Sequence, residues 1–313
     1  MLAFKTLASD MRNVIGGYFF KYGEGSCQHS IISATCLNHK YGDMFCEYNN
    51  FLYTLRSKLC DANKKERVYL FPMGDKNDIY AVKNAVENIL DDAHENDSIV
   101  KFETLTKNSA DLILNLFPGK FIAVHDRDKD EYICSFDRQT NMQGSDLAVK
   151  RNKIRSFYKN YNDRFSISLI KPEHIEKIRT FQNNWLAEKF SRDYDYNQIM
   201  QLKNENEGIQ TALDNFFEIG LSGVVAFIDN EIAAYAYGAP LNNNFFDAIV
   251  GKGDRKFLNI HRALNLAFVK NCCVGYDYIN YEEDLGVQGL RTRKIEDRPD
   301  FLIKKYILTE VRA

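Results

Sequence analysis

The chain has 313 residues, of which 45% are hydrophobic and 27% charged, with a formal net charge of −2. This composition is that of a globular protein, and the length exceeds what one core usually organises, so we expect two domains. The near-neutral charge argues against a dedicated DNA-binding protein, although it is compatible with a local basic patch.

Membrane and secretory signals are both absent from the sequence. No apolar run approaches the ~20 residues that a membrane helix needs, so we expect no membrane insertion. Residues 1–10 lack the basic start and continuous apolar stretch of a secretory signal. The seven cysteines are scattered and never spaced CxxC, which favours reduced thiols. We therefore expect a cytoplasmic location.

Cysteines and histidines gather in one part of the N-terminal region. The group consists of Cys27, His29, Cys36, His39 and Cys46. Zinc prefers these residue types, but their spacings match no common zinc finger. We interpret them as small buried residues and surface histidines, and predict no metal site.

The first half of the chain alternates strand and helix patterns. Apolar residues recur at helical spacing after the turn Pro72–Asp75, whereas β-branched and aromatic runs precede and follow them. The expected elements are strands at 67–72 and 99–105, helices at 79–93 and 110–117, and a hairpin of strands at 121–124 and 132–134.

A basic amphipathic helix is predicted next. Ile154, Phe157, Tyr158 and Tyr161 fall at i, i+3, i+4 and i+7, so they share one face. Lysines and arginines from residue 150 to 159 lie ahead of and around this face. We interpret residues 146–165 as a bridge between an N-terminal domain, 1–145, and a C-terminal domain, 166–313.

The second half gives helix, hairpin, strand, glycine-containing basic loop, helix, strand, loop and strand. The hairpin strands are expected at 223–228 and 232–237, around the turn Asp229–Glu231. This order is that of a GNAT-type N-acyltransferase domain. The expected fold class is therefore α/β (α+β), with two tandem GNAT-like domains made of mixed sheets flanked by helices.

The loop 251–256 is the first candidate binding site. Gly251 and Gly253 would let a ligand approach the backbone, while Lys252 and Arg255 add positive charge ahead of a predicted helix. Such a helix start favours phosphate. The alternative is an exposed turn with solvated side chains.

Acidic residues just after the strand at 276–279 form the second candidate site. Glu282, Glu283 and Asp284 lie where binding groups often sit in α/β sheets. One of them could accept the proton of an attacking amine. The alternative is a solvated loop.

Six cations near the C-terminus form the third candidate site. They are Arg291, Arg293, Lys294, Arg298, Lys304 and Lys305. Arg291 follows Gly-Leu, where its guanidinium could clamp a phosphate. The alternative is that these side chains cover apolar surface while their charged ends stay in water.

The segment Asn280–Arg291 carries the motif Asn-x-Glu-x-Asp-x-Gly-x-x-Gly-Leu-Arg. With it, the chain resembles a bacterial family of tandem GNAT-fold proteins related to the C-terminal domain of phosphatidylglycerol lysyltransferase. It is more distantly similar to Fem-type aminoacyl-tRNA-dependent transferases. Supporting matches are Phe71–Asp75, Pro118–Phe121, Asp126–Arg127, Asp130–Ser135, Lys150–Asn152, Phe181, Trp185 and Pro299–Tyr306.

The resemblance implies transfer of an acyl or aminoacyl group to an amine acceptor, with acyl-CoA or aminoacyl-tRNA as co-substrate and no permanently bound cofactor. Glu283 or Asp284 would accept the proton. Gly251, Lys252, Gly253, Arg255, Arg291 and Lys294 would hold the carrier's phosphates.

The chain departs from the family pattern at three places. A glycine expected near Asn259 is absent, residues 145–148 lack basic character, and Glu296-Asp297 replaces a Ser-Tyr pair. The alternative function is therefore a catalytically silent GNAT-fold protein that binds a ligand or partner.

Overall fold

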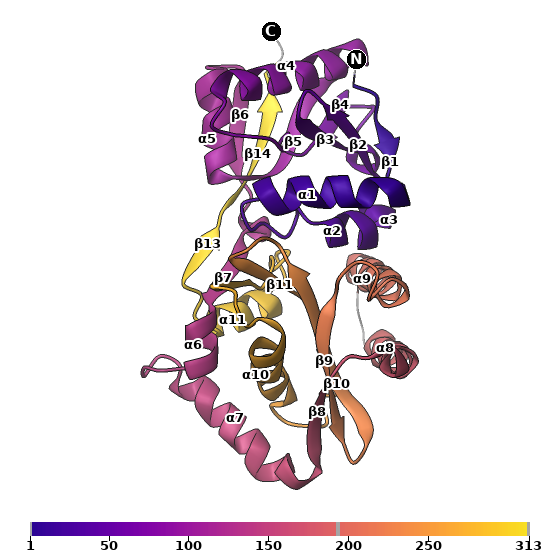
Figure 1. The fold of residues 1–313 in the computed structure, drawn as a ribbon, viewed down its shortest axis with the longest axis vertical. Coiled ribbons are helices and arrows are strands. Elements are labelled where there is room, and N and C mark those ends of the chain that lie inside the picture. The colour runs from indigo at the N-terminus through magenta and orange to yellow at the C-terminus, as the bar shows by residue number, and fades with distance from the viewer. Residues whose placement is uncertain (1, 192–194, 312–313) are drawn as a thin grey trace. The chain divides into compact units, whose positions relative to one another are not determined.

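The computed structural model describes residues 2–191 and 195–311, and its contacts divide the chain into two compact units, each built on a seven-stranded sheet (Figure 1). Unit 1 comprises the described residues of Met1–Glu131, Glu283–Gly286 and Leu302–Ala313. Unit 2 comprises those of Tyr132–Glu282 and Val287–Phe301. This division is not a single cut in the sequence, as the expected domains are, because two C-terminal segments return to unit 1.

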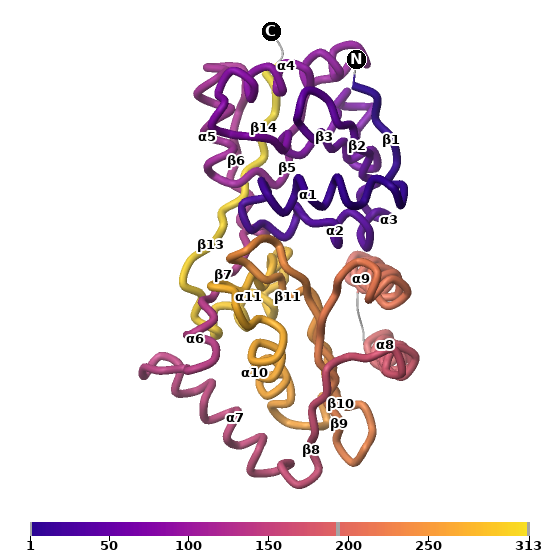
Figure 2. Tube along the Cα trace, in the orientation of Figure 1, coloured from indigo at the N-terminus to yellow at the C-terminus, as the bar shows by residue number. Residues whose placement is uncertain are grey.

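The sheet of unit 1 is mixed. In spatial order its strands are β1 (Lys5–Thr6), β2 (Asp43–Tyr48), β3 (Phe51–Arg56), β4 (Glu66–Tyr69), β5 (Ile99–Thr106), β14 (Lys305–Glu310) and β6 (Phe121–His125). Only β4 and β5 are parallel neighbours among these strands. Figure 2 traces the C-terminal segment into β14, beside strands from much earlier in the chain.

The crossover helix α4 (Ile79–Glu95) joins β4 to β5. It begins where the side chain of Asp78 accepts a hydrogen bond from the backbone N–H of Ala81, 2.9 Å away. Val82, Val86 and Ile89 lie on its buried face, as the helical spacing predicts. The other helices of unit 1 are α1 (Arg12–Tyr22), α2 (Ile31–Cys36), α3 (Asn38–Tyr41) and α5 (Lys107–Leu116).

The sheet of unit 2 has the order β13 (Phe301–Ile303), β7 (Glu131–Ser135), β12 (Tyr278–Asn280), β11 (Phe245–Gly253), β10 (Glu231–Pro240), β9 (Ser222–Ile228) and β8 (Phe165–Leu169). Strands β11 and β12 are parallel, and α10 (Ile260–Cys272) connects them. The turn between β9 and β10 places Asp229 and Asn230 at φ 55° and 67°, as a tight hairpin requires.

The remaining helices of unit 2 are α6 (Phe136–Asn141), α7 (Ala148–Tyr161), α8 (Ile175–Phe190), α9 (Tyr196–Asp214) and α11 (Gln288–Glu296). Short 3-10 helices occur at Ser9–Met11, Ser57–Leu59, Arg127–Lys129, Asn162–Arg164 and Pro172–His174. The predicted basic helix is α7, and it packs against α10 within unit 2.

The mixed α/β fold with two sheets flanked by helices is confirmed, but four local predictions are wrong. Residues 121–125 and 131–135 form no hairpin, because β6 pairs with β14 and β7 pairs with β12 in the other sheet. Residues 251–253 belong to β11 and not to a loop. The loop expected after β12 contains α11, and the last strand divides into β13 and β14.

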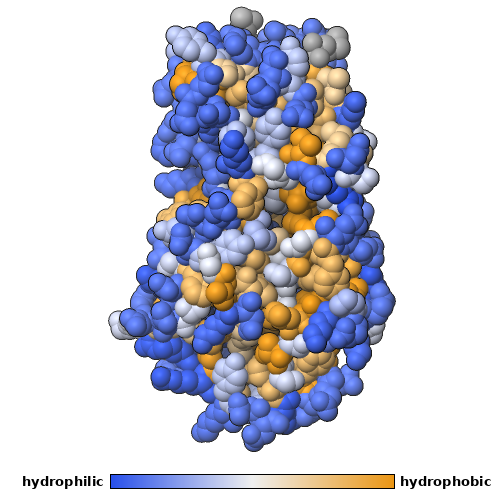
Figure 3. All heavy atoms as spheres, in the orientation of Figure 1, coloured by the Kyte–Doolittle hydropathy of each residue, from blue (hydrophilic) through white to orange (hydrophobic). Residues whose placement is uncertain are grey.

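Hydrophilic residues predominate on the face drawn in Figure 3, and apolar residues form patches among them. In the described part of the chain, no helix combines the length and apolar character that a membrane crossing needs.

Candidate functional site

The carboxylate of Glu283 lies among three polar groups of unit 1. The ammonium of Lys129 and the side-chain amide of Gln28 are both 3.3 Å from its Oε1, and the thiol of Cys27 is 3.5 Å from its Oε2. The side chain of Glu283 is 10% exposed. Its carboxylate is thus held in one orientation while part of it still reaches the surface.

The negative charge of Glu283 raises the pKa of Lys129. Burial alone would lower the pKa of Lys129, but the negative charge of Glu283 and its hydrogen bond outweigh burial, so the net shift is upward. Lys129 is therefore a permanent countercharge for Glu283.

A fully buried ion pair adjoins this carboxylate. The ammonium of Lys305 is 2.7 Å from Oε1 of Glu131, and neither side chain is exposed. Ser26 donates to the same oxygen at 2.9 Å, and the backbone N–H of Cys27 donates to Oε2 at 3.2 Å. Because the thiol of Cys27 also lies 3.2 Å from Glu131, it bridges the two glutamates. We call Cys27, Gln28, Lys129, Glu131, Glu283 and Lys305 the Glu283 cluster.

Asp284 has a different environment. Its side chain is 0% exposed, its Oδ2 is 3.3 Å from Nη1 of Arg127, and its Oδ1 accepts the backbone N–H of Gly286 at 2.9 Å. These contacts shape the turn that follows β12. Of the two predicted catalytic acids, only Glu283 retains exposed surface.

A group of cations surrounds His261 at the start of α10 in unit 2. The pKa of His261 is lowered to about 3, first by burial and then by the positive charges of Arg293, Arg255, Lys252 and Arg262, in that order. The buried Nδ1 of His261 has no hydrogen-bond partner among the described residues. We call these five residues the cationic cluster. A neutral imidazole among four cations is an environment that favours an anion.

Two members of the cationic cluster carry no ion pair in the part of the chain that the structure describes. Arg262 is paired with acids, as is Lys252, whereas Arg255 and Arg293 have no carboxylate within ion-pair distance among residues 2–191 and 195–311. Arg255 is exposed, and Arg293 is exposed as a whole residue although burial of its guanidinium lowers its pKa. Neither charge is neutralised by an ion pair within these ranges.

Lys252 is held by an aromatic and an acidic side chain. Its ammonium lies 4.2 Å from the ring centre of Trp185 and 2.7 Å from Oε1 of Glu205. Lys189 lies over the same indole at 4.8 Å. Trp185 thus contacts two cations, Lys189 four positions later on α8 and Lys252 of β11.

The glycines of β11 have separate roles. A Cβ on Gly253 would lie 3.0 Å from Cγ2 of Ile260 and 3.1 Å from Cε1 of His261, so this glycine lets the first turn of α10 approach the strand. Gly251 is exposed, and a Cβ there would meet nothing within 4 Å. Asn259 adopts φ 68°, the conformation that the expected glycine would supply, and gives α10 no side-chain cap.

The helix α11 carries Arg291 and Lys294 together with Arg293 of the cationic cluster. Lys294 lies 5.7 Å from the ring centre of Tyr132. The four charges that act most strongly on His261 do not include those of Arg291 and Lys294. The structure therefore brings Lys252 and Arg255 to the cationic cluster, and leaves Arg291 and Lys294 on α11 beside it in sequence.

The end of α11 is anchored where the sequence departs from the family pattern. Arg262 bonds to both Asp297 and Glu296, the latter at 2.7 Å, and the ammonium of Lys150 is 2.9 Å from Asp297. Cations of α10 and α7 thus form ion pairs with the acidic pair Glu296-Asp297.

The five cysteines and histidines weighed as metal ligands do not converge. Cys27 belongs to the Glu283 cluster, and Nδ1 of His29 lies 3.4 Å from the carbonyl oxygen of Gly23. Within the described ranges, no group of three or more histidines, cysteines and acids is arranged to hold a metal ion.

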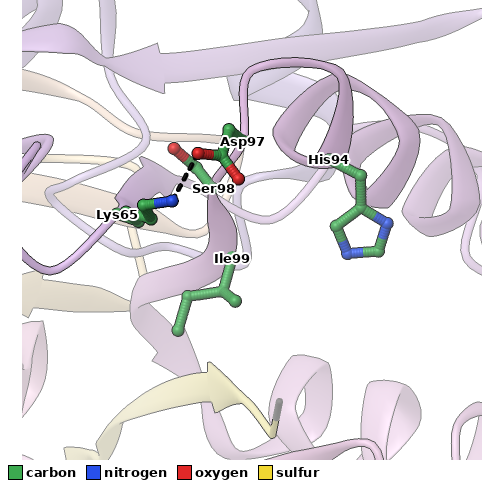
Figure 4. A pocket seen from close by; sticks show the side chains of 5 residues that line it. All are labelled: Lys65, His94, Asp97, Ser98 and Ile99. Carbon is green, nitrogen blue, oxygen red and sulfur yellow. Dashed lines mark hydrogen bonds and ion pairs between the residues drawn. The ribbon is translucent and has the colours of Figure 1, made fainter. Parts of the chain in front are cut away.

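A hollow of about 260 Å³ lies elsewhere in unit 1 (Figure 4). It is lined by Lys65, His94, Asp97, Ser98 and Ile99. Lys65 and Asp97 pair with each other, and Nε2 of His94 lies 2.9 Å from Glu310. Its charges are satisfied within the protein, and it contains no predicted site residue.

The sequence carries no signal for several members of the two clusters. Cys27 and Gln28 lie in a loop between α1 and α2, and Glu131 begins a strand assigned to a hairpin. Lys305 is fully buried, so the alternative that its charged end stays in water is wrong. Only long-range contacts identify these residues, although a lysine at the start of a strand could prompt a search for a buried acid.

Comparisons with known proteins place these clusters in a family context. Residues 21–309 match the profile of the family described as phosphatidylglycerol lysyltransferase, C-terminal. A comparison with curated proteins gives no match.

Among solved structures, a conserved protein of unknown function from Bacteroides thetaiotaomicron is similar, with 25% identity and a TM-score of 0.90 over 99% of this chain and 100% of that one. L-PGS from Bacillus licheniformis is similar with 15% identity and a TM-score of 0.64, over 95% of this chain and 90% of that one. FemX is similar with 8% identity and a TM-score of 0.63, over 98% of this chain and 97% of that one. The last two likenesses show the fold alone.

Proposed function

Because the chain belongs to the phosphatidylglycerol lysyltransferase C-terminal family, we propose that it is a transferase that moves an aminoacyl group from an aminoacyl-tRNA to an amine acceptor. An acyl-CoA is the second donor that this proposal admits. Both donors carry their reactive group on a phosphate-rich carrier, so both require a cationic binding surface.

The observation that carries the proposal is the cationic cluster. Arg255 and Arg293 are exposed without ion pairs among the described residues, and they lie around the uncapped start of α10. The start of α10 has no side-chain cap, and guanidinium groups near it suit phosphate oxygens. The neutral His261 adds no charge of its own, and its Nδ1 is buried without a hydrogen-bond partner among the described residues.

Glu283 is the proposed proton acceptor. In the transfer step the acceptor nitrogen bonds to the carbonyl carbon of the donor, and the bond from that carbon to the carrier's oxygen or sulfur breaks. The nitrogen loses a proton to the Glu283 carboxylate, while the carrier leaves and takes up a proton. The exposed edge of Glu283 supports this role, whereas the burial of Asp284 and its pairing with Arg127 support a structural one.

The test is a transfer assay with labelled aminoacyl-tRNA, acyl-CoA and a panel of acceptors. The panel includes free amines, peptide amines and phosphatidylglycerol, the lipid named in the description of the family. Transfer from tRNA supports the proposal, transfer from CoA alone selects the second donor, and no transfer with either donor contradicts it.

Carrier binding is tested separately by titrating tRNA at several salt concentrations. Arg293→Ala should weaken binding and reduce the slope of log affinity against log salt by about 1. Arg155→Ala, an exposed arginine on α7, is the matched control and should change neither. Binding without transfer would favour the silent binding protein, in which Glu283 serves only its buried neighbours.

A further inference from the structure

The edge strand β6 of unit 1 is open along one side. Strand β14 pairs with one side of β6, and β6 is the last strand in its sheet. Within the described ranges, no backbone hydrogen bond reaches β6 from any other segment. Exposed strand edges usually carry a lysine, a proline or a bulge that blocks pairing. Residues 121–125 carry none of these.

The hydrogen bonds at its two ends show which residues face outward. The N–H of Asp126 donates to the carbonyl of Lys305 at 2.9 Å, and the N–H of Val311 donates to the carbonyl of Lys120 at 2.9 Å. Even-numbered residues therefore face β14. Because facing alternates along a strand, the backbone groups of Phe121, Ala123 and His125 point to the open side.

The side chains of the even-numbered residues share one face of β6. Ile122 is 61% exposed and Val124 is 58% exposed, so two large apolar side chains lie next to each other in solvent. Asp126 follows them on the same face, whereas the ammonium of Lys120 lies 3.6 Å from Oε1 of Glu310. Along the strand, this face therefore runs apolar, apolar, anion.

We propose that β6 pairs antiparallel with β6 of a second copy of this chain, about a two-fold axis at Ala123. In this register Ala123 opposes its own copy and Phe121 opposes His125, so each outward N–H meets a carbonyl. Ile122 then opposes Val124 on both sides of the axis.

This register explains why the proposed partner of β6 is a second copy of the same chain. A two-fold axis makes the same patch meet itself, so it suits a sequence that is complementary to its own reverse. Apolar pairs directly opposite each other stabilise a strand pair. A pairing shifted by one residue would put outward backbone groups opposite inward ones and lose the hydrogen bonds.

The first measurement is the mass of the protein in solution by light scattering over a wide range of concentration. The wild type should form a species of twice the chain mass as concentration rises. Val124→Lys should keep it monomeric, because two cations would then replace the apolar pairs. Val274→Lys, at an equally exposed valine of unit 2, is the matched control and should dimerise as the wild type does.

The register is tested with Ala123→Cys under mild oxidation. The two thiols lie opposite each other in the proposed pair, at a separation that a disulfide spans, so a covalent dimer should form. Val149→Cys, an exposed position on α7, should not cross-link. A wild type that stays monomeric at every concentration overturns the proposal, as does a dimer that survives Val124→Lys.

Discussion

The ammonium of Lys129 lies 3.3 Å from Oε1 of Glu283, the same oxygen that accepts a hydrogen bond from Gln28. This contact joins a turn after β6 to a segment that follows β12, more than 150 positions later in the chain. It gives Oε1 of Glu283 a cationic neighbour, and it leaves the second oxygen beside Cys27. The Glu283 cluster thus combines a fixed orientation with a negative charge.

Replacing Glu283 by glutamine should abolish most transfer while the fold persists. The amide keeps the shape of the side chain but takes up no proton, and general base catalysis contributes about 10²- to 10⁴-fold. The measurement is initial rate with saturating donor and acceptor. Glu282→Gln, at the neighbouring acid, is the control and should retain activity. Equal losses in both variants would assign the effect to the segment's conformation.

Breaking the pair of Lys305 and Glu131 should destabilise unit 1 strongly. Lys305→Met leaves a buried carboxylate without its countercharge, which costs about 3–5 kcal/mol. Urea unfolding measures the loss. The double variant Lys305→Met with Glu131→Gln should recover part of it, since no buried charge then remains. A single variant as stable as the wild type would show that the pair is hydrated.

The sequence predicted local elements well where they depend on neighbouring residues. The apolar stripe of Val82, Val86 and Ile89 correctly predicts α4, and the turn residues Asp229-Asn230 correctly predict the hairpin of β9 and β10. It failed where pairing is decided by distant residues. Strands β6 and β7 look like a hairpin because they are close in sequence, but each finds a better partner in a different sheet.

The same distinction applies to the candidate site. Glu283 and Lys252 could be selected because their residue types and positions after or within strands suit the chemistry. Cys27, Glu131 and His261 could not, since their significance comes from partners that only the fold supplies. The Gly251–Gly253 pattern was misplaced for a physical reason: Gly253 accommodates α10 against β11.

Asp297 should hold α11 in place through two buried cations. Asp297→Asn removes the charge that faces Arg262 and Lys150, and leaving these cations uncompensated should cost about 3 kcal/mol. Hydrogen exchange of the α11 amides should also accelerate. Glu296→Gln is the control, because its side chain is 48% exposed and its pair should contribute about 1 kcal/mol or less. Equal effects of the two substitutions would contradict this anchoring.

Stability should fall as pH is lowered, partly because of His261. Its pKa is about 3 in the folded protein and near 6.5 when unfolded, so below pH 6.5 the unfolded state binds more protons. Each such histidine contributes a slope of about 1.4 kcal/mol per pH unit between these two values. His29, whose pKa burial also lowers well below its usual value, adds a second contribution.

Urea unfolding across pH 4 to 7 should therefore show a shallower slope for His261→Gln than for the wild type, with His29→Gln as the matched comparison. Phosphate should affect the pH dependence of stability differently for the two histidines. Adding inorganic phosphate should reduce the slope due to His261, because an anion in the cationic cluster favours the charged imidazole and raises its pKa. It should leave the contribution of His29 unchanged, since the charges that act most strongly on that ring are those of Lys305, Lys76 and Arg56 and not those of the cationic cluster. The same phosphate effect in His261→Gln would place the bound anion elsewhere.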